Sequence, residues 1–173
     1  MGQHVLIVDS TDGTGKTSIA QEISRLSGVP YFKNGDEHRF FQSDPSYFIH
    51  AIRYVDPYFA RYLGASGASV ILDRAYPSEW VYSQALGRST DMAVIDWLDR
   101  FYAQLGAKIF MPYRTSYDHL DDYDVIKERI WEIDGLYAEF AGWTRCPVLR
   151  LCVDGQDLDG DAVRVLRFMR GTP

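Results

Sequence analysis

A glycine-rich segment near the start of the chain limits the folds that this sequence can adopt. The segment, residues 9–18, reads DSTDGTGKTS. It follows the apolar run VLIV at residues 5–8, which is typical of a strand buried on both faces. After it, apolar residues recur with helical spacing until residues 28–30, whose sequence GVP ends the predicted helix. A buried strand, a glycine-rich turn and an amphipathic helix in this order predict a strand–loop–helix unit of a parallel sheet.

The residue types in this turn suit a phosphate-binding loop. Gly13 and Gly15 let backbone N–H groups wrap a phosphate that side chains would obstruct, and the following helix adds its positive dipole end. In this pattern Lys16 reaches the β- and γ-phosphates of a nucleotide, and the Thr17 hydroxyl binds Mg²⁺. The residues predicted to bind the donor nucleotide in this loop are Gly13, Thr14, Gly15, Lys16, Thr17 and Ser18.

One position departs from the usual loop pattern, which has glycine where this chain has Ser10. Serine is small, so the loop prediction stands. The competing interpretation is a glycine-rich turn with an incidental lysine.

The rest of the chain alternates short apolar runs with helical patterns, as βαβ units do. The predicted strands are residues 5–8, 29–32, 68–72, 107–111 and 147–153. One long amphipathic helix is expected from an apolar stripe between Ile126 and Phe140. We therefore expect an α/β three-layer sandwich with a five-stranded parallel sheet, formed by residues 1–173 as a single domain. Its ligand crevice would lie at the carboxyl ends of the strands.

Composition limits the binding partners and the cellular compartment that can be expected for this protein. The formal net charge is -6 and the pI about 5.1, which argues against a protein that coats a nucleic acid polymer. No stretch approaches the roughly 20 apolar residues of a membrane span. No signal peptide is evident, and Cys146 and Cys152 form no disulfide framework. These features predict a cytoplasmic protein with small-molecule partners, no membrane association and reduced cysteines.

A second acidic residue fits the same chemistry. Asp73 ends the next strong strand, where phosphate-loop proteins place the carboxylate that supports Mg²⁺. A role as helix cap or turn residue is the alternative. The residues that follow extend the signal, because positions 73–82 read DRAYPSEWVY.

With these two motifs the chain resembles the thymidylate kinase-like family of P-loop nucleotide kinases, including viral-type deoxynucleoside monophosphate kinases. The family's loop reads approximately EGxDGxGKTT, which residues 9–18 match with Asp9 for Glu and Ser10 for Gly. Of its second signature, approximately DRYxxSxxAY, this chain has Asp73, Arg74, Ser78 and Tyr82, and it departs with Ala75 in place of the first tyrosine. The resemblance implies a P-loop kinase that uses ATP as donor and Mg²⁺ as cofactor.

The resemblance also implies roles for individual residues. Asp12 matches the aspartate that touches the sugar 3′-hydroxyl, and Arg74 matches the arginine that clamps the acceptor phosphate. Lys33 falls where an arginine binds the same phosphate, although Arg39 competes for that role and a solvated lysine is the plain alternative. Arg53 falls where an arginine reads the base, and Phe48 lies next to the base-stacking position. Lys16, Arg74, Asp12 and Asp73 are thus the expected catalytic residues.

Two further features follow from the resemblance. A short lid over the donor phosphates is expected around residues 113–124, with Arg114 as its arginine. Family members are often homodimers, so a homodimer is one expected assembly.

The leading interpretation is a kinase that transfers the γ-phosphoryl group of ATP to a deoxynucleoside monophosphate, whose base the sequence leaves open. One alternative is a deoxynucleoside kinase that phosphorylates a 5′-hydroxyl. That reaction needs a carboxylate base, for which Asp9 and Glu37 are the candidates. The other alternative is a nucleotide-binding module without catalysis.

Overall fold

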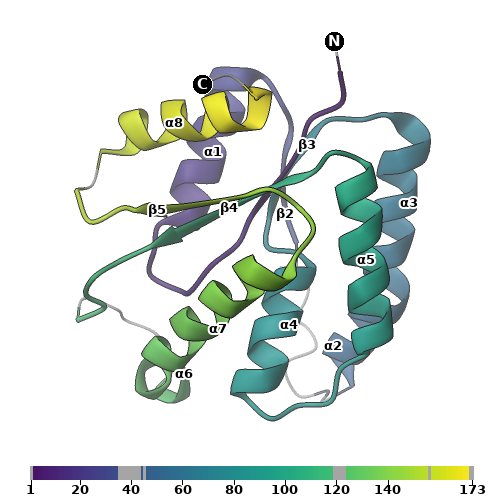
Figure 1. Cartoon of the computed structure of the whole chain (residues 1–173), viewed down its shortest axis with the longest axis vertical. Coiled ribbons are helices and arrows are strands. Elements are labelled where there is room, and N and C mark those ends of the chain that lie inside the picture. The colour runs from purple at the N-terminus through teal and green to yellow at the C-terminus, as the bar shows by residue number, and fades with distance from the viewer. Residues whose placement is uncertain (1, 35–43, 45, 119–123, 156, 172–173) are drawn as a thin grey trace.

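The computed structural model describes residues 2–34, 44, 46–118, 124–155 and 157–171. Its strands form one parallel sheet of five, in the order β2-β3-β1-β4-β5, and this confirms the predicted fold class (Figure 1). In chain order the strands are β1 (Val5–Val8), β2 (Tyr31–Lys33), β3 (Val70–Asp73), β4 (Lys108–Tyr113) and β5 (Val148–Cys152).

The strand β1 lies at the centre of the sheet, which explains its uninterrupted apolar sequence. All four of its residues are buried, and it pairs with β3 on one side and β4 on the other. The register aligns Val8 with Asp73, so the chain leaves β1 and β3 at the same level. The backbone N–H of Asp9 still donates to Phe110 O at 3.0 Å, and that of Arg74 to Val8 O at 3.0 Å. The glycine-rich loop and the second motif therefore start side by side at the carboxyl edge.

Helices cover both faces of the sheet (Figure 1). On one face, α1 (Lys16–Ser27) and α8 (Leu158–Arg170) pack together over a core that includes Leu6 and Phe110. On the other face, α3 (Asp56–Ser66), α4 (Tyr76–Ala85), α5 (Met92–Gln104) and α7 (Ile130–Trp143) enclose a core that includes Ile7. Neighbouring residues of β1 thus point to opposite cores, as the two-residue period of a strand requires.

One segment differs from the sequence prediction. The single long helix expected over the Ile126–Phe140 stripe is wrong: α6 (Asp124–Glu128) ends before Arg129, and α7 starts after it. Arg129 leaves helical geometry, with φ −110° and ψ 11°, and its guanidinium donates to the Ala85 carbonyl at the end of α4. The aromatic segment before β3 consists of α2 (Tyr47–His50), a π-helical turn η2 (Ala51–Val55) and α3.

Both cysteines are free, as expected. Among the described residues, no helix combines the length and the apolar character that crossing a membrane requires.

Candidate functional site

The glycine-rich loop has the backbone that its sequence predicts. Gly13 and Gly15 have φ values of 78° and 76°, in the left-handed region that residues with a Cβ avoid. Gly15 also caps the N-terminus of α1, so the first N–H groups of the helix face the loop. A Cβ on Gly15 would meet no atom within 4 Å, so the backbone conformation is what requires glycine there. The result is an anion site made of backbone donors.

Ser10 fits the loop without strain. Among the described residues, Arg74 is the only non-glycine residue with a positive φ. Ser10 therefore has an ordinary backbone conformation. Its buried hydroxyl lies 2.8 Å from Thr14 Oγ1, and Thr14 Oγ1 donates to Thr11 O at 3.0 Å. The departure from glycine therefore adds a hydrogen bond across the loop and leaves its shape intact.

Lys16 is held inside the loop, with only 6% of its surface exposed. Its Nζ donates to Thr11 O at 2.8 Å and to Asp12 Oδ1 at 3.4 Å. Burial, followed by repulsion from Arg74, lowers the pKa of Lys16 to about 8 despite the nearby carboxylates. The charged form of Lys16 is therefore disfavoured in this structure, and a bound anion such as a phosphate would stabilise it.

Thr17 and Asp73 meet at the start of α1. Thr17 Oγ1 donates to Asp73 Oδ2 at 2.6 Å, and the Tyr31 hydroxyl donates to the same oxygen at 2.8 Å. One hydroxyl and one carboxylate are a small set of oxygen ligands, which suits Mg²⁺ that keeps waters and phosphate oxygens in its shell. Among the described residues no group of three His, Cys, Asp or Glu side chains is placed to hold a metal alone. The site thus fits a cation that arrives with a nucleotide.

Asp12 and Arg74 form an ion pair at the mouth of the loop. The Arg74 guanidinium donates to Asp12 Oδ1 and, at 2.9 Å, to Ser78 Oγ, while the Tyr82 hydroxyl donates to Asp12 Oδ2 at 2.7 Å. Burial would raise the pKa of Asp12, but Arg74 and Lys16 outweigh it and hold that pKa far below its ordinary value. Arg74 itself has φ 68°, a strained conformation of the kind that clusters at functional sites.

Asp9 is fully buried behind this pair, at the N-terminus of α4. Its carboxylate accepts from the backbone N–H groups of Ala75 and Ser78 at 3.1 and 3.0 Å, and from the hydroxyls of Ser78 and Tyr137 at 2.7 and 2.8 Å. Burial raises the pKa of Asp9, against the opposing effect of Arg74 and these donors. Four donors on one covered carboxylate make Asp9 a structural anchor of α4.

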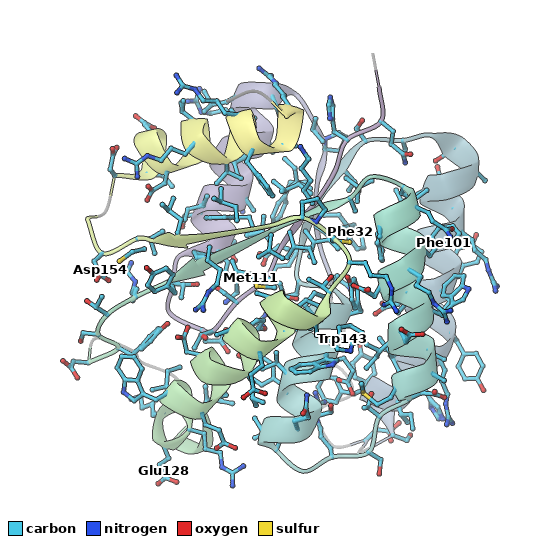
Figure 2. All side chains as sticks on the ribbon, viewed as in Figure 1. Phe32, Phe101, Met111, Glu128, Trp143 and Asp154 are labelled. Atoms are coloured by element: carbon cyan, nitrogen blue, oxygen red, sulfur yellow. The ribbon has the colours of Figure 1, made fainter. Side chains whose placement is uncertain are left out.

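The predicted lid arginine does reach the loop. Arg114, just after β4, donates from Nε to Gly13 O at 3.0 Å, and its NH1 lies 4.0 Å from Asp154 Oδ1. Figure 2 shows Asp154 just beyond β5, where it also accepts from the Thr115 N–H at 3.1 Å. The expected lid is described only in part, because residues 119–123 lie outside the described residues.

The residues expected at the nucleoside end are more scattered. Lys33 ends β2 in register with Asp73, which places it at the same carboxyl edge. Arg53, with 44% of its side chain exposed, donates to Asp91 at 2.7 Å. Phe48, at the start of the aromatic segment, lies under the Arg88 guanidinium, 3.9 Å from it to the ring centroid. Arg39 and Glu37 lie outside the described residues. The structure thus brings together the loop, Asp73, Arg74 and Arg114, and turns Arg53 to a surface ion pair.

Of the comparisons with known proteins, only the one with solved structures finds matches, and these concern the fold. No family model matches the chain, and no curated protein matches its sequence. The YorR protein from Bacillus subtilis, in complex with phosphorylated GDP, matches with a TM-score of 0.64 at 13% identity, covering 98% of this chain and 99% of that one. Thymidylate kinase from Ehrlichia chaffeensis matches with a TM-score of 0.64 at 17% identity, covering 97% and 99%.

A third solved structure is a deoxyadenosine kinase from M. mycoides with the products dCMP and a flexible dCDP bound. It matches with a TM-score of 0.51 at 18% identity, covering 96% of this chain and 98% of that one. The fold is that of the P-loop nucleotide kinases. It is shared by enzymes with different acceptors, so the acceptor must be argued from the site.

Four hydroxyls of the site were assigned no role in the sequence analysis. Ser78 and Tyr82 belong to the second motif, and that membership was the signal available for them. Tyr137 and Tyr31 carry no motif: Tyr137 reaches Asp9 across 128 residues of sequence, and Tyr31 reaches Asp73 across 42. Contacts of this kind leave no local pattern.

Proposed function

We propose that this chain is a Mg·ATP-dependent kinase that transfers the γ-phosphoryl group to a deoxynucleoside monophosphate and releases the diphosphate. The arrangement of Arg74 carries this proposal. Its guanidinium is fixed at the mouth of the loop by Asp12 and Ser78, on the side where an acceptor would approach Lys16. A planar guanidinium offers two parallel donors, the geometry that a phosphate group fills. An acceptor that already carries a phosphate is the ligand such a clamp suits.

The carboxylates argue against the deoxynucleoside kinase alternative. A 5′-hydroxyl acceptor needs a base within reach, whereas a monophosphate is already ionised at neutral pH. Asp9 is buried with its lone pairs engaged by Ser78, Ala75 and Tyr137. Asp12 has a strongly lowered pKa and so is a weak base. Asp9, the only candidate base that lies within the described residues, thus does not suit the role, and neither does Asp12; Glu37 lies outside the described residues.

The proposed chemistry is positioning and charge neutralisation. The loop N–H groups and Lys16 hold the donor phosphates, and Arg74 holds the acceptor phosphate in line with them. Thr17 and Asp73 would hold Mg²⁺, which neutralises charge on the donor phosphates when bound. Arg114, anchored on the loop carbonyl of Gly13, adds a second positive group beside the donor. Asp12 keeps Arg74 oriented and offers a carboxylate oxygen to the sugar.

A coupled ADP-release assay with Mg·ATP tests the proposal. Each deoxynucleoside monophosphate and each deoxynucleoside serves as acceptor, with Lys16→Ala as the blank. We expect turnover on monophosphates, reduced on the order of 10²–10³ in kcat/KM by Arg74→Ala. Arg74→Lys should restore little, because an ammonium lacks the two parallel donors. Arg25→Ala, which removes an exposed arginine paired with Glu22, is the matched control and should leave turnover unchanged.

Two outcomes would contradict the proposal. Turnover on nucleosides alone would assign the protein to the preceding phosphorylation step. ATP binding without turnover on either acceptor class would leave a nucleotide-binding module.

A further inference from the structure

An ion pair joins the α4 helix to the segment that follows it. Arg88 NH2 donates to Glu79 Oε2 at 2.7 Å, and the Glu79 side chain is only 8% exposed. Thr90 lies beside them, close enough to help lower the pKa of Glu79, which burial raises. Glu79, Arg88 and Thr90 are called the Glu79 cluster here.

The cluster is incompletely hydrogen-bonded. Glu79 Oε1, Arg88 Nε and Thr90 Oγ1 are all buried without a hydrogen-bond partner, and the Thr90 hydroxyl does not reach bonding geometry with Glu79. Arg150 Nε is the only other such side-chain atom among the described residues. Buried polar groups in folded proteins are nearly always paired, so three unpaired atoms in one cluster call for an explanation. A ligand that supplies the missing partners is one.

The contacts connect this cluster to the proposed acceptor site. Glu79 and Tyr82 are three residues apart on α4 and so share one face of the helix. Tyr82 donates to Asp12 at the mouth of the loop. On the other side, the Arg88 guanidinium covers the ring of Phe48, the aromatic residue expected near the base. Arg53, the residue expected to read the base, is engaged with Asp91 instead.

We propose that Glu79 and Arg88 read the edge of the acceptor base. This rests on the proposed function, and it names the substrate class of that site. A carboxylate only accepts hydrogen bonds and a guanidinium only donates them, so Glu79 Oε1 and Arg88 Nε complement an edge with a donor beside an acceptor. In a lactam edge a ring N–H adjoins a carbonyl. Compared with the amino edges of adenine and cytosine, it offers this charged pair a more acidic donor and a more negative acceptor. The preferred acceptors are therefore monophosphates of guanine, thymine or uracil.

The same contacts imply a movement on binding. In this structure the three atoms are covered, and the guanidinium lies against Phe48. The base can reach Glu79 only when Phe48 and Arg88 separate. The ring of Phe48 can then stack on the base that takes the place of the guanidinium.

The test compares acceptors in the coupled assay. We expect the wild-type enzyme to favour dGMP, dTMP or dUMP over dAMP and dCMP by at least tenfold in kcat/KM. Comparing dGMP with dTMP and dUMP then identifies which lactam base the enzyme prefers. Glu79→Gln should reduce that preference about tenfold through KM, with kcat little changed. The abasic acceptor deoxyribose 5-phosphate should be used equally by both proteins. Glu132→Gln, at a carboxylate that is 53% exposed on α7, is the matched control.

A second variant distinguishes loss of base recognition from misfolding. It is needed because Glu79→Gln leaves a buried arginine without its counter-charge. Replacing a buried ion pair by apolar side chains of similar size is commonly neutral or stabilising. We therefore expect the double variant E79M/R88M to melt at or above the wild-type temperature and yet to lose the base preference. A wild-type preference for dAMP or dCMP would overturn the proposal, as would an unchanged preference in the folded double variant.

Failure of the proposed function is distinguishable from failure of this inference. If the wild-type protein phosphorylates no monophosphate, the thermal shift caused by each monophosphate replaces turnover as the readout. Stabilisation by lactam-base monophosphates that E79M/R88M abolishes would then support base reading by Glu79 and Arg88. The same stabilisation in both proteins, or none in the wild type, would refute it.

Discussion

Removing the buried charge of Lys16 should stabilise the folded protein while abolishing ATP binding. Lys16 is covered in the loop, and its pKa falls from an ordinary 10.5 to about 8, because burial and then Arg74 disfavour the charged form. At about 1.4 kcal/mol per tenfold change, this difference corresponds to about 3 kcal/mol against folding with Lys16 charged. Lys16→Met keeps the length of the side chain and removes the charge.

The net effect is smaller than this penalty, since the variant also loses the hydrogen bond to Thr11 O, which contributes about 1 kcal/mol. We therefore expect Lys16→Met to be more stable than the wild type by about 2 kcal/mol at pH 7. For a chain of this size that is a rise in Tm of about 4–8 °C.

The difference in stability between the wild type and Lys16→Met should depend on pH. Because the folded-state pKa is lower than the unfolded one, the unfolded wild-type chain binds more protons between pH 8 and 10.5. Wild-type stability therefore rises with pH across that window relative to the variant. At pH 9.5 the remaining penalty is about 1 kcal/mol, which the hydrogen bond offsets, so the two proteins should be about equally stable.

Urea unfolding of both proteins at pH 7 and pH 9.5 measures the effect as a difference, which cancels other groups that titrate in the window. Lys127→Met, at an exposed lysine of α6, is the matched control and should follow the wild type. Mg·ATP should raise the Tm of the wild type and leave that of Lys16→Met unchanged. A variant no more stable than the wild type at pH 7, or an advantage that persists at pH 9.5, would refute the reasoning.

Two other substitutions test individual roles in the site. Asp9→Asn places an amide where Ser78 and Ala75 donate, so we expect a loss of about 2–4 kcal/mol in a denaturant titration; a full loss of activity with unchanged stability would instead mark Asp9 as a base. Tyr31→Phe removes the hydroxyl that donates to Asp73, so the Mg²⁺ concentration for half-maximal activity should rise about tenfold with little change in Tm. An unchanged Mg²⁺ dependence would show that this hydroxyl does not support the metal site.

The parts of the site that sequence could predict are those in which neighbours in the chain are also neighbours in space. Residues 9–18 form their own loop, and the pairing of Lys16 with Asp12 spans four residues. The register of β1 with β3 then follows from two buried strands, and it brings Asp73 to Thr17. Asp73 was predictable because it ends an apolar run, and the carboxyl ends of parallel strands share one edge.

Other assignments needed the tertiary structure. Asp9 was a candidate base in the sequence, and only its four donors from α4 and α7 make it a structural anchor. Arg53 has the spacing of a base-reading residue, but Asp91, which begins α5, draws it to the surface. The split between α6 and α7 is equally invisible in an apolar stripe that continues through it.

By itself, then, the sequence determined the sheet, the phosphate loop and the two motifs, since apolar periodicity and glycine placement act over a few residues. The tertiary structure decided the order of the strands, the partner of each buried polar group and the neighbours of Glu79. The physical reason is that a buried polar atom must find a hydrogen-bond partner wherever the packing of the chain places one. Tyr137 finds Asp9 across the fold, whereas Glu79 Oε1 finds none within the described protein, and that unpaired oxygen is what points to the base of the acceptor.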